Sequence, residues 1–317
     1  MASELLPFIK FCEPSYHRVT FVAEFWNTLS SFAYCIPAIH FWILTGRYAN
    51  ALPECFSEKV TWRYKVSAAC WFILGLGSAA FHAFQTLWAE MWDEIGMIIS
   101  VLSLSFCMFD LHPLTTSRRG NWFYGALTLG ALAALLVYIQ IMYHPFFAAT
   151  FLVAAFTALL VSWTMPINMN KLPVKLYEES SRGPSRAARA AKDLALKTSH
   201  SLSLFSNLNM NTGVLTGVLI SIVGYAIWHI DQKCVTEGWK PSAAYPYEYD
   251  LFYWAHPVWH LCTAAGSLFF FDAMLKVRVE MYMSPLVRRA RTGSFVPMFS
   301  FTSSIKAVLG IPRSKSS

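Results

Sequence analysis

The sequence contains few charged residues. Only 14% of its 317 residues are Asp, Glu, Lys or Arg, whereas soluble domains carry about a quarter. Hydrophobic residues make up 56% of the chain, and its mean hydropathy is +0.41. One protein core of this size cannot hide so much apolar surface, so lipid is the expected solvent of much of the chain. The composition therefore predicts an integral membrane protein.

Several common motifs are also missing from the sequence. It has no Gly-rich phosphate loop and no Cys-x-x-Cys pair. Residues 1–20 lack the basic start and apolar run of a cleavable signal peptide, so we expect the first span to direct its own insertion. The net charge is +7, but in a membrane protein a basic balance mainly reflects cytosolic loops. Nucleic acid is therefore not an expected partner.

Seven stretches are long and apolar enough to cross a bilayer, which requires roughly 20 residues per helix. They lie at about 21–44, 65–87, 91–110, 122–142, 145–164, 213–230 and 251–275. The predicted fold is an all-α bundle of seven transmembrane helices in one catalytic domain, residues 1–275. Residues 166–212 form an expected cytosolic loop, with a regulatory or partner-binding segment as the alternative. Residues 276–317 form a basic, Ser-rich tail that we expect to be partly disordered.

Most Lys and Arg residues fall on one side of the predicted membrane. This side holds Arg47, Lys59 and Arg63, the long loop and the tail. Positive loops stay in the cytosol, so the C-terminus is predicted to be cytosolic and the N-terminus lumenal or extracellular. Of the seven cysteines, only Cys12 and Cys234 then lie on the lumenal side, where oxidation is possible. A disulfide between them is a hypothesis that follows from this topology.

Ionisable side chains inside a membrane are costly and usually functional, and here they cluster. They occur at the end of the second span and at the starts of the third and seventh, so they could converge at one lumenal depth. Two pairs have the i, i+4 spacing that puts both side chains on one helix face. The cluster comprises Ser78, His82, Asp93, Glu94, His256 and His260.

Three neutral imidazoles with one open position are a ligand set of catalytic zinc. Asp93 could support a ligand, act as a general base, or do both. A single intramembrane histidine could equally hydrogen-bond a neighbouring helix, but the whole set favours a metal. We expect Asp231 to be a cap or an interhelical partner rather than a catalyst. The remaining histidines are assigned no role: His17, His40, His112, His144, His200 and His229.

A second polar group lies near the N-terminus. It contains Glu13 and, entering the first span, Glu24 and Asn27 at i, i+3 spacing. These residues suggest either a site for a cation with oxygen ligands or a lumenal ion pair. Ordinary surface and cap chemistry is an equally good interpretation.

Five segments together resemble the alkaline ceramidase family. They are CEPSY, AEFWNTLS, GLGSAAFH, WDEIGM and HPVWH. The family belongs to a wider superfamily of seven-span metal hydrolases that includes the adiponectin-type receptors and the GPI-remodelling lipid hydrolases. The resemblance implies intramembrane hydrolysis of ceramide to sphingosine and a fatty acid, as part of sphingolipid metabolism in the endoplasmic reticulum or Golgi membrane.

The resemblance also assigns roles to individual residues. It implies zinc ligation by His82, His256 and His260 and further catalytic positions at Ser78 and Asp93. The lumenal disulfide of the family maps onto Cys12 and Cys234. In the amide hydrolysis that the resemblance implies, Asp93 takes a proton from the attacking water and delivers it to the leaving amine, while Ser78 helps to stabilise the oxyanion.

The sequence departs from the family at its calcium site. The family pattern resembles Asp-Trp-Cys-Glu-x-Asn, whereas this chain has Lys10 at the acidic position and Ser15 at the Asn position. Glu13 and Glu24 are retained. Calcium requires several hard oxygen ligands, so we expect weak or absent calcium dependence, with the Lys10 ammonium near the two carboxylates.

Two other functions remain open at this stage. One is a receptor or scaffold that keeps the metal for structure alone. The other is hydrolysis of a different N-acyl or ester lipid, and the reverse acylation of a sphingoid base is also accessible. No obligate protein partner is indicated.

Overall fold

A computed structural model describes residues 10–53, 55–107, 210–236 and 251–287, besides a few isolated positions. The predicted spans at 122–142 and 145–164 lie outside the described residues, as do most of the loop at 166–212 and most of the tail.

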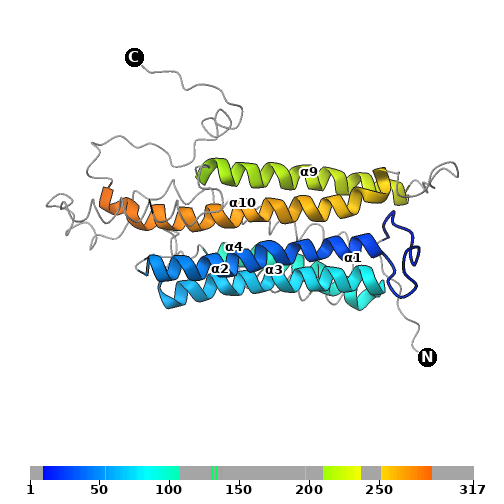
Figure 1. The fold of residues 1–317 in the computed structure, drawn as a ribbon, viewed down its shortest axis with the longest axis horizontal. Coiled ribbons are helices and arrows are strands. Elements are labelled where there is room, and N and C mark those ends of the chain that lie inside the picture. The colour runs from blue at the N-terminus through cyan, green and yellow to red at the C-terminus, as the bar shows by residue number, and fades with distance from the viewer. Residues whose placement is uncertain are drawn as a thin grey trace, which may run out of the picture.

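The described residues form helices and contain no strand. The elements are α1 (Phe25–Ser31), the 3-10 turn η1 (Phe32–Tyr34), α2 (Cys35–Ala51), α3 (Glu58–Phe84), α4 (Leu87–Cys107), α9 (Met210–Thr236) and α10 (Leu251–Val287) (Figure 1). α1, η1 and α2 follow one another as a single rod. The 3-10 turn lies just before Pro37. Proline has no backbone N–H to donate to the carbonyl four residues earlier, and its ring crowds that carbonyl, so regular α-helical bonding is interrupted here.

Four helices are long and apolar enough to cross a membrane: Phe25–Ala51, Glu58–Phe84, Thr212–Gln232 and Tyr253–Val279. α4 is apolar too, but it differs from these four because it carries three acidic residues near its start, Glu90, Asp93 and Glu94, all of which are buried in the bundle. The prediction of an all-helical fold is therefore confirmed for the described residues, and these apolar helices support the prediction of a membrane protein. The number of seven spans and the orientation of the termini remain predictions.

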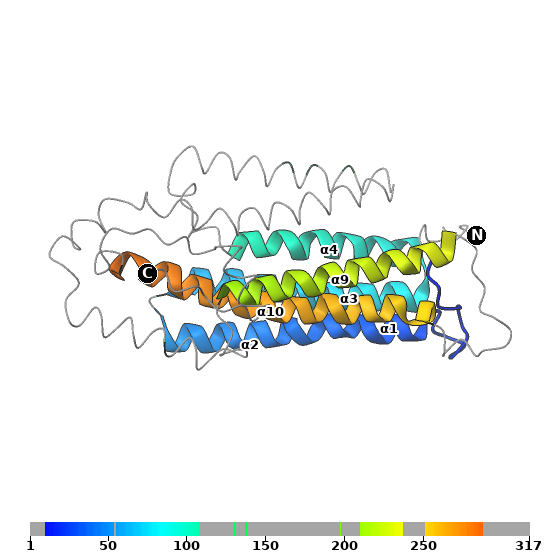
Figure 2. The same ribbon diagram turned by 90° about the horizontal axis from the view of Figure 1, so that it is seen from above.

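Apart from the pair α1 and α2, helices that follow one another in the chain run in opposite directions, so some helices begin at the same end of the bundle at which others finish. α1, α4 and α10 begin there, α3 and α9 finish there, and the N-terminal segment lies beside them (Figures 1 and 2). We call this the histidine end, because it carries His82 near the end of α3 and His256 near the start of α10. The sequence prediction that these side chains share one depth depends on this arrangement.

Close packing of small residues holds the helices together. A Cβ atom on Gly217 in α9 would lie 2.8 Å from the Gly266 carbonyl oxygen in α10. A Cβ atom on Gly266 would likewise lie 2.8 Å from the Gly217 carbonyl oxygen. Without a hydrophobic driving force between helices in lipid, such close backbone contact is a main source of helix association. Further along, the rings of Phe41 and Phe271 stack with centroids 4.3 Å apart.

α10 continues past residue 275, where the last span was expected to end. Its additional turns carry Lys276 and Arg278, which are buried. Lys276 Nζ lies 3.2 Å from Asp272 Oδ2, and Arg278 Nε donates to the Cys55 carbonyl oxygen at 2.7 Å. A basic sequence is typical of a solvated tail, but here its cations have buried partners, which allows the helix to continue.

Candidate metal centre

A tight helical hairpin sets the depth of the first site residues. α3 ends because Gln85 adopts a left-handed conformation (φ 50°), with its N–H bonded to the Phe81 carbonyl oxygen at 2.8 Å. Thr86 then caps α4 by accepting the Glu90 N–H at its carbonyl oxygen (3.0 Å). Ser78 and Asp93 are equally far from this turn in sequence, so the hairpin brings them to the same level.

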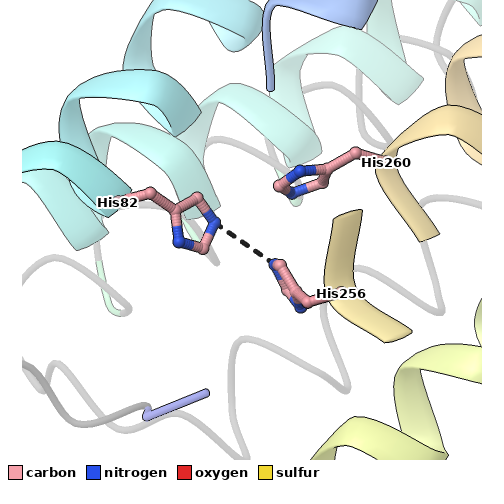
Figure 3. A group of neighbouring side chains, drawn as sticks. All are labelled: His82, His256 and His260. Atoms are coloured by element: carbon pink, nitrogen blue, oxygen red, sulfur yellow. Dashed lines mark hydrogen bonds between the residues drawn. The ribbon is translucent and has the colours of Figure 1, made fainter. Parts of the chain in front are cut away.

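Three buried histidines converge at the histidine end (Figure 3). His82 comes from α3, whereas His256 and His260 occupy successive turns of α10. One ring nitrogen of each lies within 4.8 Å of the others, and the Nε2 atoms of His82 and His256 are 3.2 Å apart. Among the residues that the structure describes, this is the one group of at least three His, Cys, Asp or Glu side chains placed to hold a metal ion.

The opposite nitrogen of each ring faces an oxygen atom. His82 Nδ1 lies 2.7 Å from Glu24 Oε2. His260 Nδ1 lies 2.8 Å from Ser30 Oγ, and His256 Nδ1 lies 3.4 Å from Asp231 Oδ2. An Nδ1–H group directed at an oxygen leaves the Nε2 lone pair available, which is the usual arrangement around metal-binding histidines.

The central nitrogens fit a cation better than they fit one another. His260 Nε2 is buried without a hydrogen-bond partner. With protons on both Nδ1 atoms, His82 and His256 present two lone pairs to each other across 3.2 Å. A cation between them replaces this repulsion with ligation and gives His260 Nε2 a partner. The residues present therefore fit a metal ion.

The segment before α1 positions Glu24. The N–H groups of Ala23 and Glu24 donate to the carbonyl oxygens of Ala83 and His82 at 2.9 and 3.0 Å, so this segment satisfies carbonyls that the end of α3 leaves unpaired. Its carboxylate then reaches the His82 ring and also accepts from Asn27 Nδ2 at 2.9 Å. The sequence suggested a cation site, a lumenal ion pair or ordinary cap chemistry for Glu24, whereas the structure places its carboxylate against a histidine ring.

The predicted catalytic pair is brought together beside the histidines. Ser78 lies one helical turn before His82, and its hydroxyl bonds to the Asp93 carboxylate. Ser78 Oγ is also 3.1 Å from Ser31 Oγ, and both Ser78 and Asp93 are buried. A hydroxyl and a carboxylate thus share a site next to the candidate metal ligands.

Two of the candidate calcium residues, Glu13 and Glu24, both bond to Asn27. The buried Glu13 carboxylate accepts the N–H groups of Trp26 and Asn27 at 2.7 and 2.8 Å, and so caps α1. Burial raises the pKa of Glu13 to about 7, against the lowering effect of these two hydrogen bonds. Ser15 is exposed. Lys10 is exposed too, and among the described residues no ion pair joins it to Glu13 or Glu24.

Cys12 takes part in a disulfide bond. Its expected partner, Cys234, has a side chain outside the described residues. Five other cysteines form no disulfide bond: Cys35, Cys55, Cys70, Cys107 and Cys262.

Two histidine partners were not identified from the sequence as parts of the site. The sequence gives only a weak indication that Ser30 belongs to the site, namely a hydroxyl three residues after Asn27 within an apolar helix. Asp231 was expected to be an interhelical partner, and its contact with His256 agrees with that expectation.

Apolar helices around a buried histidine cluster define a helical membrane protein with a candidate metal centre. The sequence model of the Ceramidase family matches residues 7–291, so the chain belongs to the ceramidase family. It is 27% identical to alkaline ceramidase 3 of Mus musculus over 163 residues, which cover 50% of this chain and 57% of the relative.

A second relative comes from Dictyostelium discoideum and carries the name "Putative alkaline ceramidase dcd3A". The identity is 28% over 151 residues, which cover 46% of this chain and 52% of the relative. The chain thus spans about half the length of the curated relatives that it matches.

Proposed function

We propose that this protein hydrolyses the amide bond of ceramide within the membrane, using zinc, and releases a sphingoid base and a free fatty acid. The observation that carries the proposal is the buried histidine cluster with its Nε2 atoms turned inward, beside Ser78 and Asp93. Membership of the ceramidase family supports the choice of substrate.

The ligand chemistry supports zinc in particular. Three imidazoles suit zinc and other borderline metals, whereas calcium and magnesium prefer oxygen ligands. Zinc at this position would polarise the amide carbonyl and lower the pKa of a bound water. With three protein ligands, His82, His256 and His260, one coordination position stays open for that chemistry.

Asp93 and Ser78 would act in sequence. The Asp93 carboxylate takes a proton from the attacking water as the new C–O bond forms. In the resting site the Ser78 hydroxyl interacts with the Asp93 carboxylate. Once Asp93 is protonated it no longer needs this donor, so the Ser78 hydroxyl can turn to the developing oxyanion. Asp93 then gives its proton to the amine nitrogen as the C–N bond breaks.

The membrane setting follows the sequence predictions. We propose seven spans, a lumenal N-terminus, a cytosolic C-terminus and a site open to the lumenal side of the endoplasmic reticulum or Golgi membrane. The distribution of Lys and Arg supports this orientation. The disulfide state of Cys12 supports a Cys12–Cys234 bond, and mass analysis that finds both thiols free in the native protein would contradict it.

The central experiment uses the full chain purified in detergent. Bound zinc is quantified, and ceramides of several chain lengths are assayed with the wild type, His82→Ala and Asp93→Asn. We expect about one zinc per wild-type chain and release of sphingoid base by the wild type alone. Asp93→Asn should keep its zinc and lose turnover, because the amide cannot accept the proton.

Each contrary result has a separate meaning. Full activity of Asp93→Asn would refute the assigned base. Bound zinc without turnover on any ceramide would favour another lipid substrate or a receptor with a structural metal. A folded preparation without zinc would contradict the metal centre itself.

A further inference from the structure

One carboxylate joins the histidine cluster to the N-terminal segment. Asp231 is fully buried near the end of α9. Its Oδ2 lies 3.4 Å from His256 Nδ1, a polar contact without hydrogen-bond geometry, and also accepts from Gln232 Nε2 at 3.4 Å. Its Oδ1 accepts the N–H of Cys12 at 3.2 Å. The two oxygens thus serve two partners far apart in sequence, one of which is a candidate metal ligand.

The rotation of α9 explains why this carboxylate faces inward. Gly224 lies two turns before Asp231, on the same face of the helix. A Cβ atom at Gly224 would be 2.9 Å from the Cβ of Cys262, so the two backbones approach closely just beyond His260. This contact turns the Asp231 face of α9 toward α10.

The residue next to Cys12 covers the histidines. The ring centroid of Phe11 lies 3.9 Å from that of His256 and 4.9 Å from that of His82. It also makes an edge contact with Phe81 at 6.0 Å. An apolar ring in this place shields two candidate ligands from water.

We propose that Asp231 is a positioning residue with two linked tasks. It holds the Nδ1–H of His256 so that Nε2 faces the metal, and it holds the Cys12 N–H so that Phe11 stays over the cluster. Loss of the carboxylate removes the acceptor of the Cys12 N–H on the cover and the oxygen that faces His256 Nδ1 on the ligand. The inference rests on the proposed metal centre but not on which lipid is hydrolysed.

The test compares full-length Asp231→Ala, Asp231→Asn, Phe11→Ala and Phe11→Leu in detergent. His229→Ala is the matched control, because His229 is exposed on α9 two residues away. One readout is zinc affinity and release rate by competition with a chelator, which requires no turnover. The other is amide hydrogen exchange over residues 10–16, which reports the Cys12 N–H bond.

We expect Asp231→Ala to weaken zinc binding by about 10- to 100-fold and to speed amide exchange. Asp231→Asn keeps an acceptor oxygen, so its loss should be less than about tenfold. Phe11→Ala should release zinc faster, and Phe11→Leu should restore slow release because an apolar cover is retained.

Wild-type zinc affinity in a folded Asp231→Ala protein would overturn the proposal while leaving the proposed function intact. Equal losses in the Ala and Asn variants would also overturn it, because they would show that charge rather than the acceptor matters. If wild-type protein binds no zinc, the proposed function fails first, and the positioning role fails with it.

Discussion

Ser30 provides the sharpest test of how the histidine cluster is organised. Its hydroxyl donates to the Asn27 carbonyl oxygen at 3.1 Å. When its single proton is used there, Ser30 Oγ accepts from His260 Nδ1, which is 2.8 Å away. Ser30 therefore fixes the proton of His260 on Nδ1 and leaves Nε2 as the ligand atom.

Ser30→Ala removes this acceptor with little other damage. The Asn27 carbonyl oxygen still accepts from Ser31 Oγ at 2.7 Å, and the Asn27 backbone also bonds to the fully buried His260 ring, which therefore loses one of two oxygen partners. A typical hydrogen bond contributes about 0.5–1.5 kcal/mol. At about 1.4 kcal/mol per tenfold change, zinc affinity should fall by roughly 2- to 10-fold.

The assay is competition for zinc between purified protein and a chelator of known affinity. Ser30→Thr keeps the hydroxyl and should restore most of the affinity. Thr28→Ala is the matched control, because its hydroxyl bonds only to the Glu24 carbonyl oxygen (2.6 Å) on the same helix. If Ser30→Ala binds zinc as tightly as Thr28→Ala, the reasoning from the His260 proton is wrong.

Three further predictions concern other parts of the molecule. Ser78→Ala should retain zinc and lose about 100- to 1000-fold in kcat if its hydroxyl stabilises the oxyanion; a change in KM alone would contradict that role. Selective removal of calcium should leave turnover nearly unchanged, and strong loss restored by added calcium would show that Glu13 and Glu24 hold the ion despite Lys10 and Ser15. Gly266→Ala should destabilise the protein by about 1–3 kcal/mol, seen as a lower Tm in detergent, because the new Cβ meets the Gly217 carbonyl oxygen at 2.8 Å. Gly46→Ala, with open space around it, is the control and should not lower the Tm.

The convergence of the three histidines could be predicted from the sequence. His256 and His260 are one turn apart, and the short link after α3 places Ser78, His82 and Asp93 at one depth. Helical period and chain direction are sufficient for this step, since neither depends on how the helices rotate. The helical membrane class followed from the composition and from the length of the apolar stretches.

The partners of the histidines could not be predicted in the same way, because they depend on rotation. α9 is apolar on most of its surface, so no hydrophobic stripe shows which side meets α10. Only the close approach of Gly224 to Cys262 turns Asp231 inward. Likewise, nothing in the pattern around Ser30 distinguishes a hydroxyl that bonds the helix backbone from one that also holds an imidazole.

The histidine cluster therefore depends on the relative position of several segments. Each ring is held from a different place: His82 by Glu24 before α1, His260 by Ser30 in α1, and His256 by Asp231 in α9. In lipid, small-residue packing brings helices close, and polar contacts at their ends then fix rotation and depth. A slight separation of α9 from α10 would lengthen the Asp231–His256 contact while leaving every helix folded. Zinc affinity should consequently be more sensitive to packing at Gly217 and Gly266 than helix content is.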